Sequence, residues 1–486
     1  MIEINHVSFT YKDAVNGSAI KDISVKIPKG QAVLLCGESG SGKTTFSRLI
    51  NGLVPAYYKG NLNGNIIVEG RETCETELYE LAPMVGSVFQ NPKAQFYTLI
   101  TDTEIVFACE NIGIDRESIL KRFDDTVNAL HMENLIGKSL FALSGGEKQK
   151  IACASVYALT PDILVLDEPT SNLDIKTIQD LKEILRKWKA QGKTIIIAEH
   201  RLAWLGNIVD RILYFKNGML TEDFDKNAFF RKTPSELHDM GLRAEYDFVP
   251  QCKCIPTEGR VIEISNFYYS IKGKELLNVK HLSIPKGAII AILGNNGAGK
   301  TSFARCLCGL LKKAEGVLLM EGKRYGNKQR TNLCYMVMQD VNHQLFTESV
   351  IDEVRLGTDT PNNKSGMAFI EEILKGLDLL DYKDEHPMAL SGGQRQRVAV
   401  ASAIASYKEI IVFDEPTSGL DYRHMEEVAD NILKLSKLGK TIFIITHDPE
   451  LVAACCNYFI FLEKGMVTRY GGWDSKNIEF VSNYFQ

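Results

Sequence analysis

The chain has 486 residues, more than one hydrophobic core ordinarily supports, so roughly two to four domains are expected. Its composition is 45% hydrophobic and 24% charged, as in soluble globular proteins, and its formal net charge of −5 gives no general attraction to nucleic acid or anionic lipid. No apolar run approaches the length of a membrane span (about 18 residues) and no signal peptide opens the chain. These features predict an intracellular protein that reaches a membrane only through a partner.

The eleven cysteines are scattered along the chain. Their close pairs lack the spacing of a zinc site, so we expect reduced, buried thiols and no metal bound by cysteine. The close pairs are Cys252 and Cys254, Cys306 and Cys308, and Cys455 and Cys456.

In chain order, the first strong signal is an apolar run that leads into a glycine-rich loop. The run QAVLLCG predicts a buried strand, and GESGSGKTT at residues 37–45 fits the pattern G-x-x-x-x-G-K-[ST]. Glycines let backbone N–H groups turn toward phosphate oxygens, and the following helix adds its positive N-terminus. We therefore expect Lys43 to reach the β- and γ-phosphates of a nucleotide, and Thr44 to offer its hydroxyl to Mg²⁺. The other expected nucleotide contacts in this loop are Gly37, Ser39, Gly40, Gly42 and Thr45.

Two later apolar runs end in residues suited to hydrolysis. DILVLDE predicts a strand that ends at Asp167 and Glu168, and TIIIAEH predicts one that ends at His200. Asp167 suits a contact with Mg²⁺, Glu168 can polarise an attacking water, and His200 can hold the γ-phosphate and that water. Continuous apolar runs indicate a parallel sheet covered on both faces, with ligands bound at the carboxyl ends of its strands.

A connector separates the two halves of the chain. Within it, Thr233, Pro234 and Glu236 predict a helix that starts with a capping box, and the rest is expected to be irregular. We expect a first domain over residues 1–225, the connector over 226–259 and a second domain over 260–486.

The second half repeats the first in the same order. Lys43 and Lys300 lie 257 residues apart, and from the pair Ser144 and Ser391 onward the offset is 247. A constant offset indicates two copies of one domain. AIIAILG, EIIVFDE and TIFIITH are the matching predicted strands. The matching site residues are Gly294, Asn296, Gly297, Gly299, Lys300, Thr301, Ser302, Asp414, Glu415 and His447.

Each half also carries LSGG followed by polar residues. The first copy, LSGGEKQK, contains Ser144 and the second, LSGGQRQR, contains Ser391, each about a hundred residues after its glycine-rich loop. A Ser-Gly-Gly turn that opens a helix is typical of an anion-binding site.

These motifs resemble those of ATP-binding-cassette (ABC) ATPases over nearly the whole chain. The resemblance rests on both phosphate loops, on Gln90 and Gln339, on both LSGG motifs, on LDEPTSNLD and FDEPTSGLD, and on both histidines. It implies an α/β fold of two P-loop domains, each with a mainly parallel core sheet, an antiparallel β subdomain and a helical subdomain that carries LSGG. It also implies ATP and Mg²⁺ as ligands. The residues implied to serve Mg²⁺ are Thr44, Gln90, Asp167, Thr301, Gln339 and Asp414.

In this family two domains meet head to tail, and each LSGG motif closes on the nucleotide held by the other domain. The resemblance thus implies that Ser391 and Gly393 cap the ATP on Lys43. Ser144 and Gly146 would cap the ATP on Lys300, and the two halves of one chain would form the ATPase dimer.

Members of the family usually stack adenine on an aromatic side chain before the first core strand. Tyr11 fills that position in the first half. Strict alignment places Ile271 opposite Tyr11, so Tyr269 is the candidate in the second half.

The segments after the two glutamines resemble those of ATPase subunits of energy-coupling-factor (ECF) importers of vitamins and metal ions, whose pattern is close to Q-N-P-x-x-Q-F. The first half reads QNPKAQFYT, with Gln95 as the second glutamine; the second reads QDVNHQLFT, with Gln344, and departs at Asp340 and Val341. The resemblance implies a peripheral protein on the cytoplasmic face of the cell membrane. Its implied partners are a transmembrane subunit and a substrate-binding membrane subunit, with no nucleic acid.

An apolar pair follows each second glutamine: Phe96 and Tyr97 in one half, Leu345 and Phe346 in the other. If exposed, these pairs would form small apolar patches for docking the transmembrane partner.

Two alternatives stay open. One is the tandem ATPase of another importer, such as a sugar-type subunit, in which one half usually has a damaged site, whereas both are intact here. The other is a soluble tandem cassette that acts on ribosomes, although that group carries a long charged linker that this chain lacks. The sequence does not name the cargo.

Overall fold

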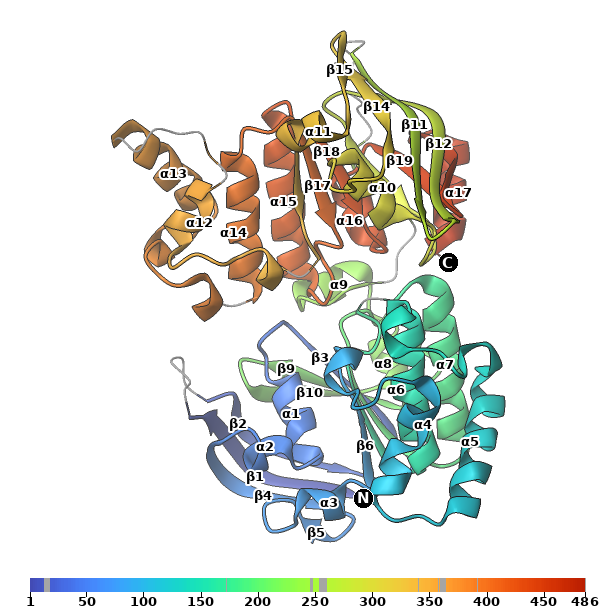
Figure 1. The fold of residues 1–486 in the computed structure, drawn as a ribbon. Helices are drawn as coiled ribbons and strands as arrows, with labels where there is room; N and C mark the ends of the chain where they lie inside the picture. Colours follow the sequence, from blue (N-terminus) through green and yellow to red (C-terminus); the bar gives the residue numbers. More distant parts are fainter. Residues whose placement is uncertain are drawn as a thin grey trace. The chain divides into compact units, whose positions relative to one another are not determined.

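The computed structural model describes residues 1–12, 18–171, 173–244, 248–252, 260–339, 341–356, 358, 364–390 and 392–485. Contacts divide the chain into two units. The first unit is Met1–Tyr246 with Gly419–Arg423, and the second is Asp247–Ser418 with His424–Gln486. Both are α/β units built on two sheets (Figure 1).

The core of the first unit is a six-stranded sheet in the order β10-β9-β3-β8-β7-β6. The five strands from β9 to β6 are parallel, and β10 pairs antiparallel with β9 at one edge. β3 and β8 are buried along their whole length, as expected of central parallel strands covered on both faces. The predicted parallel sheet is therefore confirmed. Its strands are β3 (Ala32–Gly37), β6 (Val85–Val88), β7 (Ile163–Asp167), β8 (Thr194–Ala198), β9 (Arg211–Lys216) and β10 (Met219–Asp225).

A four-stranded antiparallel sheet packs on this core, in the order β2-β1-β4-β5. Ile2, Ile4 and Phe9 on β1 are fully buried and join Val33 and Leu35 of β3 in one hydrophobic cluster. The strands are β1 (Ile2–Tyr11), β2 (Ile20–Ile27), β4 (Gly60–Val68) and β5 (Arg71–Glu72).

The helices of the first unit flank the core sheet and form a separate helical region around α4, α5 and α6 (Figure 1). The α6 helix starts at the first LSGG motif, where Ser144 and Glu147 form a capping box. The helices are α1 (Lys43–Ile50), α2 (Leu53–Ala56), α3 (Leu78–Leu81), α4 (Thr101–Asn111), α5 (Arg116–Leu130), α6 (Gly145–Leu159), α7 (Ile175–Ala190), α8 (Lys226–Phe229) and α9 (Pro234–Asp239), with 3-10 turns η1 (Pro92–Ala94), η2 (Glu133–Leu135), η3 (Leu140–Ala142) and η4 (Ala203–Leu205).

The second unit repeats both sheets with the same strand order, which supports the duplication seen in the sequence. The core sheet runs β16-β17-β18-β13-β19-β20 and the antiparallel sheet runs β12-β11-β14-β15. The strands are β11 (Val261–Ile271), β12 (Lys274–Pro285), β13 (Ile289–Leu293), β14 (Glu315–Met320), β15 (Lys323–Tyr325), β16 (Cys334–Val337), β17 (Ile410–Asp414), β18 (Thr441–Ile445), β19 (Tyr458–Glu463) and β20 (Met466–Gly472).

The helices of the second unit follow a similar sequence of elements, except that α2 has no counterpart, the helix α16 replaces the turn η4, and a longer helix, α17, follows the last strand. The α15 helix starts at Tyr422, inside the segment Gly419–Arg423. The helices are α10 (Lys300–Leu307), α11 (Asn327–Leu333), α12 (Val350–Leu356), α13 (Lys364–Gly376), α14 (Gly392–Ala405), α15 (Tyr422–Lys437), α16 (Pro449–Cys455) and α17 (Ser475–Phe485), with 3-10 turns η5 (Val341–His343), η6 (Leu380–Tyr382) and η7 (Pro387–Ala389).

The connector is more ordered than its sequence predicted. The capping box of Thr233 and Glu236 at the start of α9 is confirmed. The expectation of irregular structure elsewhere is wrong at α8, where the Asp225 side chain accepts a hydrogen bond from the Asn227 backbone and caps the helix. Phe229, at the end of α8, is fully buried in the core of the first unit.

Most of the described cysteines are buried, as expected, but Cys74 is exposed and Cys252 is half-buried, while Cys254 lies outside the described residues. None of the helices in the described ranges has the length and apolar character to cross a lipid bilayer.

Candidate functional site

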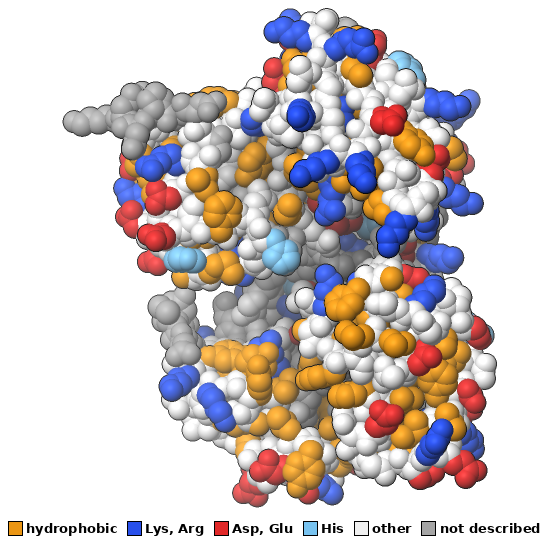
Figure 2. All heavy atoms as spheres, viewed as in Figure 1, with side chains coloured by type: hydrophobic (Ala, Val, Ile, Leu, Met, Phe, Trp, Pro, Cys, Tyr) orange, Lys and Arg blue, Asp and Glu red, His pale blue; other side chains and the backbone are white. Residues whose placement is uncertain are grey.

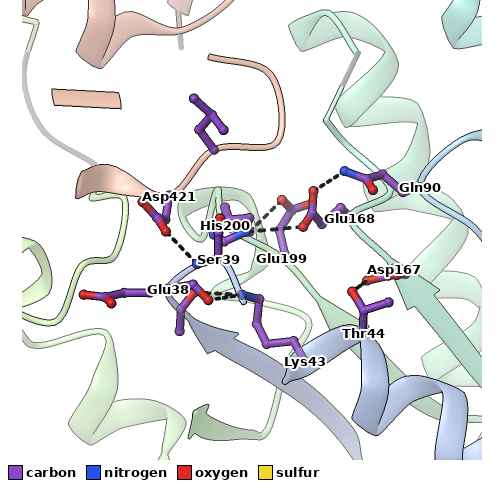
Figure 3. A network of polar contacts seen from close by, with 12 residues as sticks. Glu38, Ser39, Lys43, Thr44, Gln90, Asp167, Glu168, Glu199, His200 and Asp421 are labelled. Carbon is purple, nitrogen blue, oxygen red and sulfur yellow. Dashed lines mark hydrogen bonds and ion pairs between the residues drawn. The ribbon is translucent and has the colours of Figure 1, made fainter. Parts of the chain in front are cut away.

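The phosphate loop of the first unit joins β3 to α1. Gly37 has φ 144°, and a Cβ there would lie 2.2 Å from the Phe215 carbonyl oxygen, so only glycine fits. The Lys43 ammonium donates to the carbonyl oxygens of Gly37 at 2.9 Å and Glu38 at 2.8 Å (Figure 3). Lys43 is only 4% exposed. Burial lowers the pKa of its ammonium group, although the negative charge of Glu168 acts in the opposite direction. The loop thus holds a buried cation beside backbone N–H groups, which suits an anionic ligand.

Two oxygen ligands suitable for Mg²⁺ lie beside this lysine. The Thr44 hydroxyl donates to the Asp167 carboxylate at 3.0 Å. Burial, reinforced by the charge of Glu168, raises the pKa of Asp167 to about 6. A divalent cation would favour the ionised carboxylate, and hydroxyl and carboxylate oxygens are the donors that Mg²⁺ prefers. The residues present therefore fit the cation that the sequence predicted.

Glu168 lies at the centre of the first site (Figure 3). Its carboxylate accepts a hydrogen bond from Gln90 Nε2 at 2.6 Å, and it lies 3.3 Å from His200 Nε2. Burial lowers the pKa of His200, with the charge of Lys43 acting in the same direction. The imidazole is thus neutral near pH 7 and can donate through Nε2. The predicted residues Lys43, Gln90, Glu168 and His200 are brought together.

The backbone of Glu168 is strained, with φ 44°. Glu415, at the matching position of the second half, has φ 50°. A left-handed conformation at a residue other than glycine costs about 1–3 kcal/mol. Both halves keep this strained turn after the strand that ends in aspartate, as they keep a left-handed residue at other matched positions such as Asn217 and Lys464.

Glu199, which the sequence analysis did not select, is a buried carboxyl group next to His200. It accepts hydrogen bonds from the backbone N–H of His200 at 2.8 Å and from the hydroxyl of Thr170 at 2.6 Å. Burial raises the pKa of Glu199 to about 7. The sequence did carry a signal, because AEHR and ITHD differ at the residues flanking the two histidines.

A short segment from the second half of the chain belongs to the first unit. In it, the Asp421 carboxylate accepts a hydrogen bond from the backbone N–H of Ser39 in the phosphate loop at 2.6 Å (Figure 3). Tyr422 stacks on His238 of α9 with ring centroids 3.6 Å apart, and Arg243 Nε donates to the Leu420 carbonyl at 3.2 Å. The FDEPTSGLD segment therefore ends against the phosphate loop of the other half.

The second unit builds the same loop with different contacts for its histidine. The Lys300 ammonium donates to the carbonyl oxygens of Gly294 at 2.6 Å and Asn295 at 3.2 Å, and to His447 Nε2 at 2.9 Å. His447 Nε2 lies 3.7 Å from the Glu415 carboxylate, and its Nδ1 lies 3.1 Å from the hydroxyl of Tyr484 on α17.

Two further predicted residues of the second site lie in hydrogen-bond contact with each other. Thr301 donates a hydrogen bond to Asp414, and burial raises the pKa of Asp414. A buried carboxylate also follows the histidine: Asp448 accepts a hydrogen bond from the Thr417 hydroxyl at 2.7 Å. Gln339 is exposed just beyond β16.

The LSGG motifs occupy helix starts in both units. Gly146 is buried, and a Cβ there would lie 2.8 Å from the Thr177 hydroxyl, so glycine allows α6 and α7 to approach closely. Gly393 lies in the first turn of α14, with a Cβ position 3.3 Å from the ring of His424. Ser391 and Asp340 lie outside the described residues.

The two adenine-stacking candidates differ in their surroundings. The Tyr11 hydroxyl is hydrogen-bonded to the Thr45 hydroxyl at 3.0 Å and accepts from Arg48, which fixes it beside the phosphate loop. Tyr269 packs partly buried against the core of the second unit. Ile271, opposite Tyr11 by alignment, is exposed at the end of β11.

Each loop after the glutamine is held by one buried glutamate. In the first unit, Glu104 accepts from the backbone N–H of Tyr97 and of Thr98, and from the Thr98 hydroxyl at 2.8 Å. In the second unit, Glu353 accepts from Phe346, from Thr347 and from its hydroxyl in the same pattern. We call Glu104 and Glu353 the loop glutamates.

Only one member of each apolar pair is exposed. Tyr97 is 77% exposed and Phe346 is 75% exposed, whereas Phe96 packs against the core and Leu345 is buried. Phe96 and Leu345 are therefore not part of an exposed patch. The loop glutamates hold the backbone so that the following residue, Tyr97 or Phe346, points outward. In the first unit, exposed Tyr97 stacks on Phe107, and Figure 2 shows hydrophobic side chains gathered around α4 and α6.

A family profile described as ABC transporter matches residues 20–171 and 277–418. A Treponema denticola relative, provisionally named as an ABC transporter ATP-binding protein, is 43% identical over 486 residues, covering 98% of each chain. A Methanosarcina mazei relative of the same name is 32% identical over 521 residues, covering 96% of this chain and 88% of its own. A chain from a model of ribosome-bound archaeal Pelota and ABCE1 gives a TM-score of 0.68 over 98% of this chain and 80% of that chain; at 21% identity the likeness shows the fold alone.

Proposed function

Because the chain belongs to the ABC transporter family and is a tandem ABC ATPase, we propose that it is the fused ATPase pair of an ECF-type importer. It hydrolyses ATP to drive the uptake of a vitamin or a metal ion. The observation that carries the importer assignment is the exposed aromatic residue, Tyr97 or Phe346, held by a loop glutamate a few residues after each glutamine.

Each half contributes one set of hydrolytic residues. Lys43 and Lys300 hold the β- and γ-phosphates, and Mg²⁺, held by Thr44 with Asp167 and by Thr301 with Asp414, neutralises phosphate charge when bound. Glu168 and Glu415 orient the attacking water and accept its proton.

The two ATP sites form head to tail. Ser391 and Gly393 cap the nucleotide on Lys43, and Ser144 and Gly146 cap the nucleotide on Lys300, because a helix N-terminus stabilises an anion. The proposal rests on the match of both halves to the ABC transporter family.

The loops after Gln90 and Gln339 dock the transmembrane subunit. Gln90 bonds directly to the glutamate that activates water, so the segment following it is placed to move with the nucleotide state. The loop glutamates fix the backbone of this segment, and Tyr97 and Phe346 present rigid aromatic surface to a short helix of the partner.

The two docking loops differ in sequence, which favours one asymmetric membrane scaffold over two identical subunits. A separate substrate-binding membrane subunit selects the cargo. The protein then resides on the cytoplasmic face of the membrane, and none of its described helices could cross the bilayer.

Replacing Tyr97 and Phe346 together by Asp tests the importer assignment. Because both side chains are exposed, the double variant is expected to fold and bind ATP normally, to leave the membrane fraction of its native host, and to lose ATP-dependent uptake. Membrane sedimentation and uptake of candidate vitamins or metal ions provide the two measurements.

The matched control replaces two exposed apolar residues outside these loops, Tyr79 and Leu438, by Asp. This control is expected to remain on the membrane. The importer assignment fails if the docking variant stays membrane-bound, or if the wild-type chain purifies with ribosomes.

A further inference from the structure

The last helix of the chain reaches into the second ATP site. Tyr484 lies near the end of α17, and its hydroxyl is 3.1 Å from Nδ1 of His447. Its ring packs edge-on against Phe461 of β19, with centroids 5.0 Å apart, and contacts Phe485 at 5.1 Å. The tyrosine is thus fixed on the core sheet that carries the site.

The start of α17 is also anchored to the end of the core sheet. The Asn477 amide donates to the Gly472 carbonyl at 2.8 Å, and Arg469 Nε donates to the Asn477 side chain at 2.9 Å. The N-terminal end of the helix cannot shift without breaking these bonds, and the ring packing of Tyr484 holds the other end. The geometry at His447 is therefore set by packing.

The contact at Nε2 of His447 determines which of the two ring nitrogens carries the hydrogen in the present structure. Nε2 lies 2.9 Å from the Lys300 ammonium, which can only donate, so Nε2 accepts and Nδ1 carries the hydrogen of the neutral ring. Nδ1–H then donates to the Tyr484 oxygen.

Nucleotide binding requires the other tautomer. When Lys300 turns to the phosphates, His447 can hold the γ-phosphate only by donating from Nε2–H, which leaves Nδ1 as an acceptor. A phenol hydroxyl can accept a hydrogen bond in the first state and donate one in the second.

We propose that Tyr484 is a positioning residue of the second ATP site. Its hydroxyl holds the His447 ring in place in both tautomers, so that Nε2 can move its hydrogen bond from Lys300 to the γ-phosphate. This role rests on the ATP sites proposed above and is independent of the importer assignment.

The first site provides an internal contrast. His200 Nε2 faces Glu168 at 3.3 Å, and within the described ranges the structure records no hydrogen bond to its Nδ1. In the first unit β10 is followed by α8 and α9 in place of a helix like α17. A change at Tyr484 is thus expected to affect His447 and to leave His200 unchanged.

Nitrogen NMR of ¹⁵N-histidine-labelled protein reads the tautomer directly, and the chain has only nine histidines. In the nucleotide-free wild type we expect His447 as the Nδ1–H tautomer, assigned by its loss in His447→Gln. In Tyr484→Phe, which keeps the ring packing and the Lys300 contact, we expect the same tautomer with a shifted His447 Nδ1 resonance and with His200 unshifted. Asn483→Ala, an exposed neighbour on α17, serves as the control and should match the wild type.

Turnover provides the functional test. In a Glu168→Gln chain, where hydrolysis reports the second site, Tyr484→Phe is expected to lower kcat by about threefold to tenfold, the effect of one hydrogen bond, with KM changed by less than about twofold. An unshifted His447 Nδ1 resonance in Tyr484→Phe, or an unchanged kcat, would overturn the proposal. If the Glu168→Gln chain does not turn over, the NMR spectrum decides alone.

Discussion

The two ATP sites of this chain have the same backbone fold but differ in the contacts of the histidine. In the first site, His200 lies against Glu168, which also accepts from Gln90. In the second, His447 lies between Lys300 and Tyr484, and its contact with Glu415 is longer, at 3.7 Å. A duplicated set of motifs therefore does not guarantee two equivalent sites.

The threonine two residues after each proposed reacting glutamate shows how such a difference can arise without loss of structure. Thr170 donates to Glu199, which precedes its histidine, whereas Thr417 donates to Asp448, which follows its histidine. In each half this threonine donates a hydrogen bond to one buried carboxylate, but the carboxylate comes from a different position in the sequence. The hydrogen bond is retained while the sequence around the histidine changes.

The largest effect should come from removing both reacting glutamates. Glu168→Gln combined with Glu415→Gln is expected to lower ATP turnover by about 10²–10⁴-fold, because no group then accepts the proton of the attacking water. Phosphate release measures this, and the two single variants show how the activity divides between the sites. Near wild-type turnover in the double variant would mean that the reacting groups are misassigned.

A smaller effect is expected from breaking the threonine–carboxylate pairs. Thr170→Val and Thr417→Val each leave a buried carboxyl group without one donor, which costs about 1–3 kcal/mol of the free energy of unfolding. Denaturant unfolding of each variant measures the loss. Equal losses would support the view that Glu199 and Asp448 stabilise the two halves equally from different positions. A loss in only one variant would show that they do not.

An effect of similar size is expected from a change of pH. The folded-state pKa of Glu199, about 7, exceeds the ordinary value of 4.5, so between these pH values the folded chain binds a proton that the unfolded chain has released. This group therefore stabilises the fold less as the pH rises from 4.5 to 7, with a slope of at most about 1.4 kcal/mol per pH unit.

Glu199→Gln should remove this dependence, so its stability relative to the wild type should increase from pH 5 to pH 7. Unfolding measured across that range provides the test, with Glu183→Gln, an exposed carboxylate, as the control. A constant difference between Glu199→Gln and the wild type would show that Glu199 does not titrate in this range.

The sequence predicted the parts of the site that depend on local patterns. Apolar runs such as QAVLLCG became buried strands, and the glycine loop placed Lys43 beside Glu168 as expected. Tyr484 could not be predicted, because its contact with His447 depends on how the end of the chain folds back onto the sheet. Phe96 and Tyr97 could not be sorted either, because an adjacent aromatic pair in a loop has no periodicity that separates inside from outside.

The central claim is that one chain forms two ATP sites, each with its own reacting glutamate. The most direct test is the amount of ATP retained by the Glu168→Gln and Glu415→Gln double variant after incubation with Mg²⁺ and removal of free nucleotide. The account predicts two ATP molecules per chain, bound unhydrolysed, with both lost when Lys43 and Lys300 are also replaced by Ala. One ATP per chain, or retention of ADP in place of ATP, would contradict it.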